Sequence, residues 1–364
     1  MVNKWVEISQ LINQEFRRKA AICDYEVGLL TTYRTIGRCS LFLKAENKKE
    51  LEHALDISRQ KDIEVAIIGN GSNLLISDNG FQGLIIKLGS EFEQVKIIEG
   101  HAYVGGAAKL PVVARSTSSK GLTGFEWAVG VPGTVGGAVK MNAGGHGSDM
   151  KASIESVDVL DTKTNLTEIL KPNDLLFGYR QSSISRNQLV TSAVLKLSDG
   201  NPEESSELIR EIVRWRLENQ PGGQNCGSVF VNPGPGRVAA GELIDQLGLR
   251  GFRIGTAEVS TKHANFIQAD PDGRADDVAA VMAEVRTRVH DATGYLLRSE
   301  VRLIGFEDVS CPHVTMAAGY RRNRWMLRTI LDAAAMNGWS RSPMMTSPMR
   351  CTSRETLTRA VRRA

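Results

Sequence analysis

The chain has 364 residues, enough to bury a large core in two or three domains. With 41% hydrophobic and 24% charged residues it has the composition of an ordinary globular protein, and no apolar run approaches the roughly 18 residues of a membrane-spanning helix. The net charge of +4 arises in residues 309–364, where ten arginines face only Asp332 and Glu355, so residues 1–308 carry −4 and we expect neither a membrane nor a nucleic-acid role for the main body.

The first twenty residues bear on where the protein resides. They are amphipathic with both signs of charge and lack the apolar centre of a secretory signal, so we expect a cytoplasmic protein. Five cysteines are scattered along the chain without a CxxC motif or a Cys/His cluster, which predicts reduced thiols and no metal site. They are Cys23, Cys39, Cys226, Cys311 and Cys351.

Residues 1–27 are expected to form an N-terminal helical segment, and residues 28–90 a small α/β lobe. A capping asparagine and an apolar face repeated every three or four residues predict a helix over 47–60. Apolar runs at 65–68 and 84–88 predict short strands, with a glycine loop after the first of them. This loop is Gly69-Asn70-Gly71-Ser72-Asn73.

A second lobe, rich in antiparallel or mixed sheet, is expected over residues 91–200. Strand-like segments recur there with turn residues between them, and a helix over 111–120 interrupts them. The expected strands are 95–100, 101–106, 154–161 and 189–197. The lobe also contains the chain's longest glycine-rich stretch, Gly124 to Gly145.

The two glycine-rich stretches, 69–73 and 124–145, point to a ligand. Each glycine costs about 0.5–1 kcal/mol inside a helix or strand, so glycines accumulate where the backbone must turn with positive φ or touch a ligand. Successive exposed N–H groups of such loops form nests for anions such as a pyrophosphate. Either stretch alone is most simply a turn, but the pair favours a dinucleotide held between two lobes. The spacings GxxxxGK[ST] and GxGxxG are absent, which argues against a P-loop or Rossmann site.

Residues 201–307 are expected to form a third, α/β domain, reached through the Pro/Gly-rich linker at 220–223. Its expected helices are 202–219, 238–247 and 276–293, and its expected strands are 257–259, 265–268 and 297–304. Residues 308–364 differ sharply in composition and are predicted to be a basic, partly disordered tail, in which 320–337 has the pattern of a basic helix.

Three positions carry side chains suited to catalysis. Arg180 follows a Gly-Tyr pair, and arginine suits a carboxylate or a developing enolate because its planar fork donates two aligned bonds. Ser228 starts a new element after a glycine, but no G-x-S-x-G elbow surrounds it. Glu300 shares one strand face with Arg298 and Arg302, opposite Leu297, Val301 and Leu303. A turn serine, a surface ion pair and a solvated strand face are the structural alternatives.

Taken in order, these segments resemble the UDP-N-acetylmuramate dehydrogenase family, also called UDP-N-acetylenolpyruvoylglucosamine reductases, from about Thr31 to Glu307. The motifs that carry the resemblance are GNGSN at 69–73, GVPGTVGGAVKMNAGGHG at 130–147, GYRQS at 178–182, CGSVFVNP at 226–233, AEVSTKHANFI at 257–267 and SEVRLIG at 299–305. The short stretch between Arg180 and Ser228 matches the branch without an extra tyrosine-bearing loop.

The resemblance implies an α+β fold: a two-lobed FAD-binding domain of the vanillyl-alcohol-oxidase (PCMH) type, followed by a C-terminal α/β substrate-binding domain. It implies the use of non-covalent FAD and NADPH to reduce UDP-N-acetylglucosamine enolpyruvate to UDP-N-acetylmuramate for peptidoglycan synthesis, and we expect a monomer. Arg180 and Glu300 would stabilise an enolate, and Ser228 would protonate its carbon. The residues matching FAD contacts are Gly69, Asn70, Gly71, Ser72, Asn73, Gly133, Thr134, Gly136, Gly137, Asn142 and Gly144, and those matching substrate contacts are Tyr179, Asn232, His263 and Arg302.

Three positions differ from residues common in the family: His146, Val231 and Arg298. Two alternatives remain open at this point. One is another FAD-dependent sugar or alcohol oxidoreductase of the same superfamily, many of which tether FAD through a histidine near the first phosphate loop. No histidine lies between His53 and His101, which argues against such a tether. The other alternative is a non-catalytic nucleotide-binding module.

Overall fold

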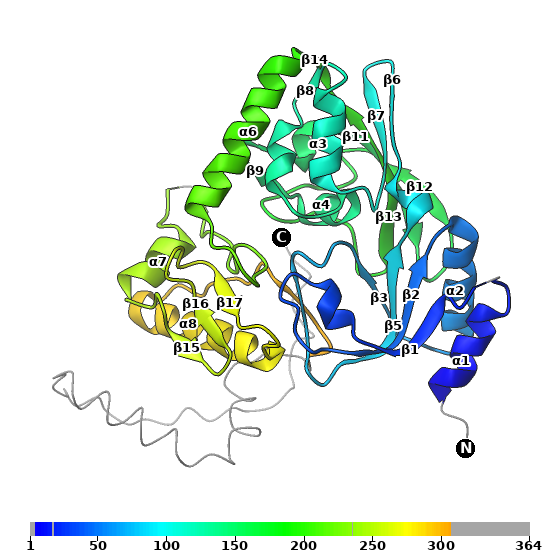
Figure 1. The fold of residues 1–364 in the computed structure, drawn as a ribbon, viewed down its shortest axis with the longest axis horizontal. Coiled ribbons are helices and arrows are strands. Elements are labelled where there is room, and N and C mark those ends of the chain that lie inside the picture. The colour runs from blue at the N-terminus through cyan, green and yellow to red at the C-terminus, as the bar shows by residue number, and fades with distance from the viewer. Residues whose placement is uncertain (1–3, 17, 235, 307–364) are drawn as a thin grey trace, which may run out of the picture. The chain divides into compact units, whose positions relative to one another are not determined.

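The computed structural model describes residues 4–16, 18–234 and 236–306, which belong to one compact unit, Met1–Glu307 (Figure 1). The basic tail expected over 308–364, with its possible helix, lies outside these described residues.

The first lobe is a four-stranded sheet with two helices on one side (Figure 1). The strand order is β1 (Ala21–Tyr25), β2 (Cys39–Ala45), β5 (Phe81–Leu88), β3 (Val65–Ile68), and all pairs are parallel except β1 with β2. The segment expected to be helical over 1–27 therefore contains one helix, α1 (Lys4–Asn13), followed by an edge strand.

Helix α2 (Lys48–Gln60) begins as predicted, because the Asn47 side chain accepts a hydrogen bond from the Glu50 N–H at 3.0 Å. The apolar face of α2 packs with α1 against the sheet. The buried residues of this cluster include Ile8, Ile12, Leu41, Leu43, Leu51, Leu55, Leu84 and Ile86. The short elements of the lobe are η1 (Val27–Leu30), β4 (Leu74–Ile76) and η2 (Ser90–Glu93).

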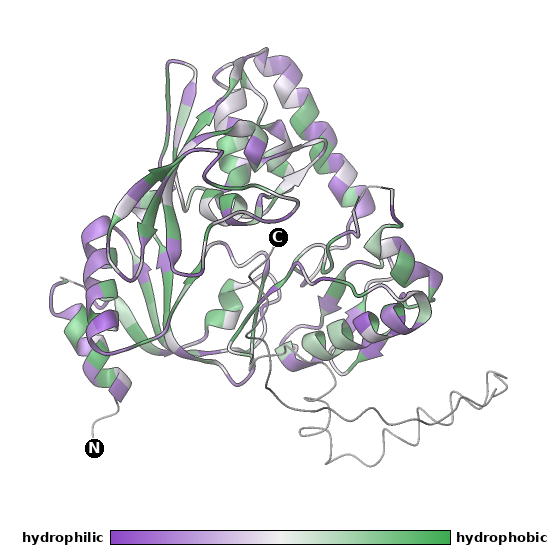
Figure 2. Cartoon of the chain, turned by 180° about the vertical axis from the view of Figure 1, so that it is seen from behind, coloured by the Kyte–Doolittle hydropathy of each residue, from purple (hydrophilic) through white to green (hydrophobic). Residues whose placement is uncertain are grey.

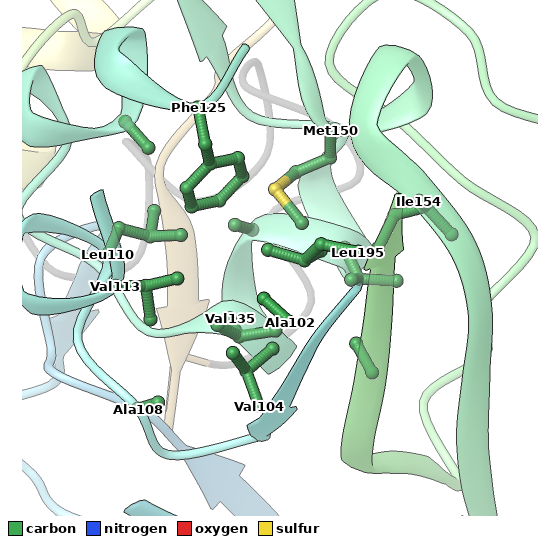
Figure 3. Close-up of a cluster of buried hydrophobic side chains, with 14 of the residues drawn as sticks. Ala102, Val104, Ala108, Leu110, Val113, Phe125, Val135, Met150, Ile154 and Leu195 are labelled. Carbon is green, nitrogen blue, oxygen red and sulfur yellow. The ribbon is translucent and has the colours of Figure 1, made fainter. Parts of the chain in front are cut away.

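The second lobe is a five-stranded antiparallel sheet. Its strand order is β12 (Thr167–Leu170), β11 (Ile154–Asp161), β13 (Gln188–Lys196), β7 (His101–Gly105), β6 (Val95–Ile98). The expected strand at 154–161 is confirmed residue for residue. Helices α3 (Leu110–Ser118) and α4 (Val135–Met141) contribute to the core that Figure 3 shows, in which side chains from strands and helices converge. Among them are Ala102, Val104, Leu110, Val113, Phe125, Val135, Met150 and Leu195.

Helix α6 (Pro202–Asn219) leaves the second lobe and leads to the third. Figure 2 shows both hydrophilic and hydrophobic residues along this helix. Its buried residues are Ser205, Ile209 and Ile212. The expected bounds, 202–219, are confirmed. The lobe's remaining elements are β8 (Leu122–Thr123), η3 (Glu126–Gly130), β9 (Gly144–Gly145), β10 (Ser148–Asp149), α5 (Met150–Ser153) and β14 (Ser198–Asp199).

The third lobe packs a small sheet against a long helix. The sheet has the order β15 (Arg253–Ile254), β16 (Ala257–Val259), β17 (Ile267–Ala269), and α8 (Ala275–Thr293) covers it. The predicted stripe Val278, Val281, Val285, Val289 is buried, and Gly294 ends α8 at φ 69°. Helix α7 (Ala240–Gln246) adds to the same core.

The chain then returns to the first lobe. Strand β18 (Arg302–Ile304) pairs in parallel with β4. The returning segment is the orange end of the ribbon in Figure 1. The prediction of one strand over 297–304 is wrong for its first half, where the only ladder contact is an isolated bridge between Ser299 and Phe230. Leu303 was expected in the core but is 37% exposed, because β18 has only β4 as a neighbour.

Candidate active site

An arginine–glutamate pair joins two lobes. The Arg180 Nε lies 3.2 Å from Glu300 Oε1, and the two side chains are only 22% and 19% exposed. Arg180 sits at φ 57° in a tight turn closed by hydrogen bonds between Gly178 and Gln181. A non-glycine residue in this left-handed region costs free energy, and such strain concentrates at functional sites. The turn thus aims one guanidinium at one buried carboxylate.

The electrostatics around Glu300 are unusual. Burial raises the pKa of the Glu300 carboxyl above its ordinary value, and the guanidinium groups of Arg180, Arg298 and Arg302 offset that rise only in part. A carboxyl with a perturbed pKa that is also paired with a defined cation is a candidate for proton chemistry.

The predicted serine lies beside this pair. The Glu300 N–H donates to the Val229 carbonyl at 2.8 Å, and the Val231 N–H donates to the Arg298 carbonyl at 2.9 Å, so the two segments run antiparallel. Ser228 directly precedes Val229 and is half-buried. Within the described part of the chain its hydroxyl has no hydrogen-bond partner. The structural alternative, a turn serine that binds local backbone, is therefore not what the structure shows.

A buried asparagine holds the serine segment in place. The Asn265 side chain, in a residue only 4% exposed, accepts from the Phe230 N–H at 3.0 Å and donates to the Phe230 carbonyl at 2.8 Å. Its backbone carbonyl accepts from the Val229 N–H at 2.8 Å. From sequence, Asn265 was a polar candidate more often structural than functional, but an asparagine two residues after a histidine gives no local signal of a partner 35 residues away.

The first glycine loop touches both the catalytic segment and the second glycine loop. Asn73 donates to the Glu300 carbonyl at 3.0 Å and accepts from the Arg302 N–H at 3.0 Å. Asn70 donates to the Pro132 carbonyl at 2.7 Å. A Cβ on Gly69 would lie 2.5 Å from the Thr134 hydroxyl, so the glycine permits close approach of the two loops.

Several backbone N–H groups of these two loops lack hydrogen-bond acceptors within the described part of the chain. From Gly69 to Asn73, and again at Gly133 and Thr134, the N–H groups donate to no acceptor among the residues that the structure describes. Gly71 is buried and adopts φ 66°, where a Cβ would come within 2.4 Å of the Leu30 carbonyl oxygen. Because buried and half-buried N–H groups are almost always paired, consecutive free donors form a site for an anion.

The remaining cofactor candidates hold the second loop together. Thr134 caps α4 and accepts from the Gly137 N–H at 3.4 Å, while Gly136 packs against the carbonyls of Gly106 and Val190, 3.1 Å from where its Cβ would be. Asn142 and Gly144 connect this loop to the arginine turn. Asn142 donates to the Gly178 carbonyl at 3.0 Å, and the Gly144 carbonyl accepts from Arg180 at 2.9 Å.

The substrate candidates divide into two groups. Tyr179 is 53% exposed beside the Arg180 guanidinium, and its carbonyl accepts from Arg298 at 3.4 Å. Arg302 is exposed next to Met141. By contrast, Asn232 accepts from the Ala240 N–H at 3.0 Å in front of α7, and among the described residues no hydrogen bond or ion pair joins it to Arg180 or Glu300.

His263 belongs with Asn232 in the third lobe. Its Nδ1 faces the Asn265 N–H at 3.2 Å, and its ring packs on Phe266 with centroids 4.7 Å apart. Burial, followed by the charge of Arg250, lowers the pKa of His263, so its ring is neutral at neutral pH. Through Asn265 it adjoins the serine segment rather than the Arg180–Glu300 pair.

Comparison with known proteins identifies the family of the chain that carries this site. Residues 219–304 match the family model described as "UDP-N-acetylenolpyruvoylglucosamine reductase, C-terminal domain", and residues 39–169 match the one described as "FAD binding domain". A UDP-N-acetylenolpyruvoylglucosamine reductase of Prochlorococcus marinus is 40% identical over 280 residues, covering 76% of this chain and 95% of that protein. The chain belongs to this reductase family.

Two further relatives agree. The reductase of Gloeobacter violaceus is 40% identical over 282 residues and is covered to 94%. The crystal structure of the Thermus caldophilus reductase matches with a TM-score of 0.66 at 33% identity, over 78% of this chain and 98% of that one. These matches confirm the expected α+β fold with an FAD-binding domain and a C-terminal reductase domain. The assignment to a shorter branch of the reductase family stays a prediction.

Neither a membrane span nor a metal centre is found in this reductase-family chain where the structure describes it. None of its described helices is long and apolar enough to cross a bilayer. Among the same residues, no three His, Cys, Asp or Glu side chains lie close enough together to hold a metal ion.

Proposed function

We propose that this protein is a cytoplasmic, monomeric enzyme that uses NADPH and bound FAD to reduce UDP-N-acetylglucosamine enolpyruvate to UDP-N-acetylmuramate. This reaction belongs to peptidoglycan precursor synthesis. The observation that carries the proposal is the Arg180–Glu300 pair at 3.2 Å with Ser228 on the adjoining antiparallel segment, in a chain of the reductase family.

The residues of both glycine loops fit FAD. The unpaired N–H groups of Gly69–Asn73, Gly133 and Thr134 would bind the negative charge of its pyrophosphate, and the αL turn at Gly71 leaves no space for a side chain. FAD, when bound, supplies the hydride chemistry. Covalent attachment through a histidine is not expected, since the segment between His53 and His101 contains none.

The arginine and glutamate would stabilise charge on the substrate. When the enolpyruvyl double bond accepts hydride at its terminal carbon, negative charge develops on the neighbouring carbon and carboxylate as an enolate. Arg180, held by its strained turn and by the Gly144 carbonyl, presents a fixed guanidinium for that charge without reorganisation during the reaction. Glu300 orients the guanidinium through their ion pair, and its raised pKa suits it to share a proton with the enolate oxygen.

Ser228 would complete the reaction by protonating the carbon. A hydroxyl is a weak acid in water, so it can donate only to a strongly basic centre against which it is well positioned. The hydrogen bonds from Asn265 fix the backbone that carries it, and its hydroxyl is not occupied by a described protein group. The substrate candidates Tyr179, Asn232, His263 and Arg302 would contact the UDP-sugar.

The two alternatives are less well supported. A sugar or alcohol oxidoreductase of the same superfamily would share the FAD-binding domain, but residues 219–304 match the C-terminal domain of the reductase. A non-catalytic nucleotide-binding module would leave the partly buried Arg180–Glu300 pair without a purpose.

The deciding assay measures NADPH oxidation by the purified protein with and without the enolpyruvyl UDP-sugar. The proposal predicts oxidation that depends on the sugar and a product heavier by two hydrogens in mass spectrometry. A rate of NADPH oxidation that is the same with and without the sugar, or an unaltered sugar after complete NADPH consumption, would contradict it.

A further inference from the structure

Three cations meet beside the predicted active site, at the end of α4. The Lys140 Nζ donates to the Ser185 carbonyl at 3.0 Å, and Arg186 follows Ser185 directly in the chain. From another lobe, an Arg302 guanidinium nitrogen lies 3.5 Å from the sulfur of Met141, the residue after Lys140. Lys140, Arg186 and Arg302 are called the cation cluster below.

The cluster has little counter-charge: the Glu300 carboxylate lies near enough to feel the charge of Arg302, but it is ion-paired with Arg180. None of its three side chains forms an ion pair with a carboxylate in the described part of the chain. Lys140 is half-buried, and burial, followed by the charges of Arg302 and Arg186, lowers its pKa. Burying an ammonium group near two like charges costs free energy that one backbone carbonyl does not recover. An anion bound between the three side chains would lower that cost.

The position of the cluster indicates which anions can reach it. The Arg302 N–H bonds to Asn73 of the first glycine loop, and the Lys140 carbonyl accepts from the Ser182 hydroxyl at 2.9 Å, two residues after Arg180. The cluster therefore borders both the loop with free N–H donors and the arginine turn. Arg186 and Arg302 are exposed, so a ligand arriving from solvent can bind their guanidinium groups.

We propose that Lys140, Arg186 and Arg302 form a subsite for a phosphate group of a nucleotide that binds at this active site. A phosphate offers a charge near −2 and several acceptor oxygens, which matches two forked guanidinium groups and one ammonium. This inference rests on the proposed function, which supplies two sources of that chemistry. They are the 2′-phosphate that distinguishes NADPH from NADH and the diphosphate of the UDP-sugar.

Binding of small probes to the purified full-length protein, measured by isothermal titration calorimetry, tests the subsite without catalysis. The probe pair 2′,5′-ADP and 5′-AMP differs in the 2′-phosphate, and the pair UDP and uridine differs in the diphosphate. The variants are Lys140→Met, which keeps an unbranched apolar chain, and Arg186→Gln at an exposed position. The matched control is Lys151→Met, which removes an exposed lysine from α5.

The subsite predicts that each cluster variant weakens one phosphorylated probe about tenfold or more relative to its unphosphorylated partner, as expected for loss of a charge-assisted bond. An effect confined to 2′,5′-ADP assigns the subsite to NADPH, and the ratio of kcat/KM for NADPH over NADH should fall with it. An effect confined to UDP assigns it to the sugar nucleotide. Equal affinities for the variants, the control and the unmodified protein with both pairs would overturn the inference.

Failure of the proposed function gives a different result. A protein that binds these probes through the cluster but never reduces the enolpyruvyl sugar would keep the subsite and lose the reductase proposal. Near-identical melting temperatures of the variants and the control would show that the binding change is local.

Discussion

Asn265 is a buried residue that holds the segment carrying the proposed catalytic serine. Asn265→Ala removes two side-chain hydrogen bonds, at 2.8 and 3.0 Å, and leaves the N–H and the carbonyl of Phe230 unpaired. Phe230 is 2% exposed, so solvent does not replace the lost partners. Each buried group left unpaired costs about 1–3 kcal/mol, which gives about 2–6 kcal/mol in total.

A loss of that size is a large part of a typical stability of about 5–15 kcal/mol, so Asn265→Ala should melt well below the unmodified protein. Differential scanning calorimetry measures it. The control is Asn219→Ala, an exposed asparagine at the end of α6 with one side-chain bond, to the Trp215 carbonyl at 2.8 Å. Its loss should cost about 0.5–1.5 kcal/mol or less.

A second substitution separates hydrogen bonding from packing. In the unmodified protein the Phe230 carbonyl accepts from the Asn265 side-chain amide. Asn265→Asp keeps an acceptor for the Phe230 N–H but places a carboxylate oxygen against that carbonyl. It should remain destabilised at neutral pH and recover as the pH falls and the new carboxyl becomes a donor. If Asn265→Ala and Asn219→Ala melt at the same temperature, the assigned role of Asn265 is wrong.

Three further predictions concern the cofactor site and the acid limit of stability. Gly71→Ala should lower the flavin absorbance per protein on purification, because φ 66° and a Cβ within 2.4 Å of the Leu30 oxygen distort the first glycine loop. Acid precipitation should release all flavin into the supernatant, and flavin in the pellet would contradict non-covalent binding. Burial raises the pKa of Glu126, but hydrogen bonds from Ser205, Thr123 and Gly124 outweigh it and lower that pKa below its ordinary value. Its stabilisation is therefore present above the unfolded pKa of about 4.3 and is lost as the pH falls through the folded pKa. Glu126→Gln should lower the melting temperature at pH 7, and the difference in melting temperature from the unmodified protein should become smaller in acid. A difference that grows in acid would refute this.

The helices with strong local signals could be predicted from sequence. The expected bounds of α6 are confirmed, and α2 begins at its predicted cap, because an asparagine before a periodic apolar face specifies a helix start wherever it occurs. Helix α4 was not predicted. Its first turn contains Gly136 and Gly137, which disfavour a helix locally, and the reason for Gly136 is a close contact with the Gly106 and Val190 carbonyls from elsewhere in the fold.

The site shows the same division. The glycine loops were recognisable from composition, because positive φ and close approach of neighbouring backbone both favour glycine. The Arg180–Glu300 ion pair joins residues far apart in the chain, so no local pattern could reveal it, and only the family resemblance placed both residues in one site. The strand expected over 297–304 was wrong in its first half only, because alternation predicts a face but not a partner: residues 297–301 form a single bridge, whereas Arg302–Ile304 pairs with β4.

The central claim is that Ser228 donates the proton that completes sugar reduction. Stopped-flow absorbance of the flavin follows the two half-reactions separately, for the unmodified protein, Ser228→Ala and Ser228→Cys. The account predicts that Ser228→Ala is reduced by NADPH at the normal rate, whereas its reoxidation by the enolpyruvyl UDP-sugar slows by a factor of about 10²–10⁴, with Ser228→Cys less impaired because it retains a proton. Equal slowing of both half-reactions in Ser228→Ala would show that the serine only shapes the site and would contradict the account.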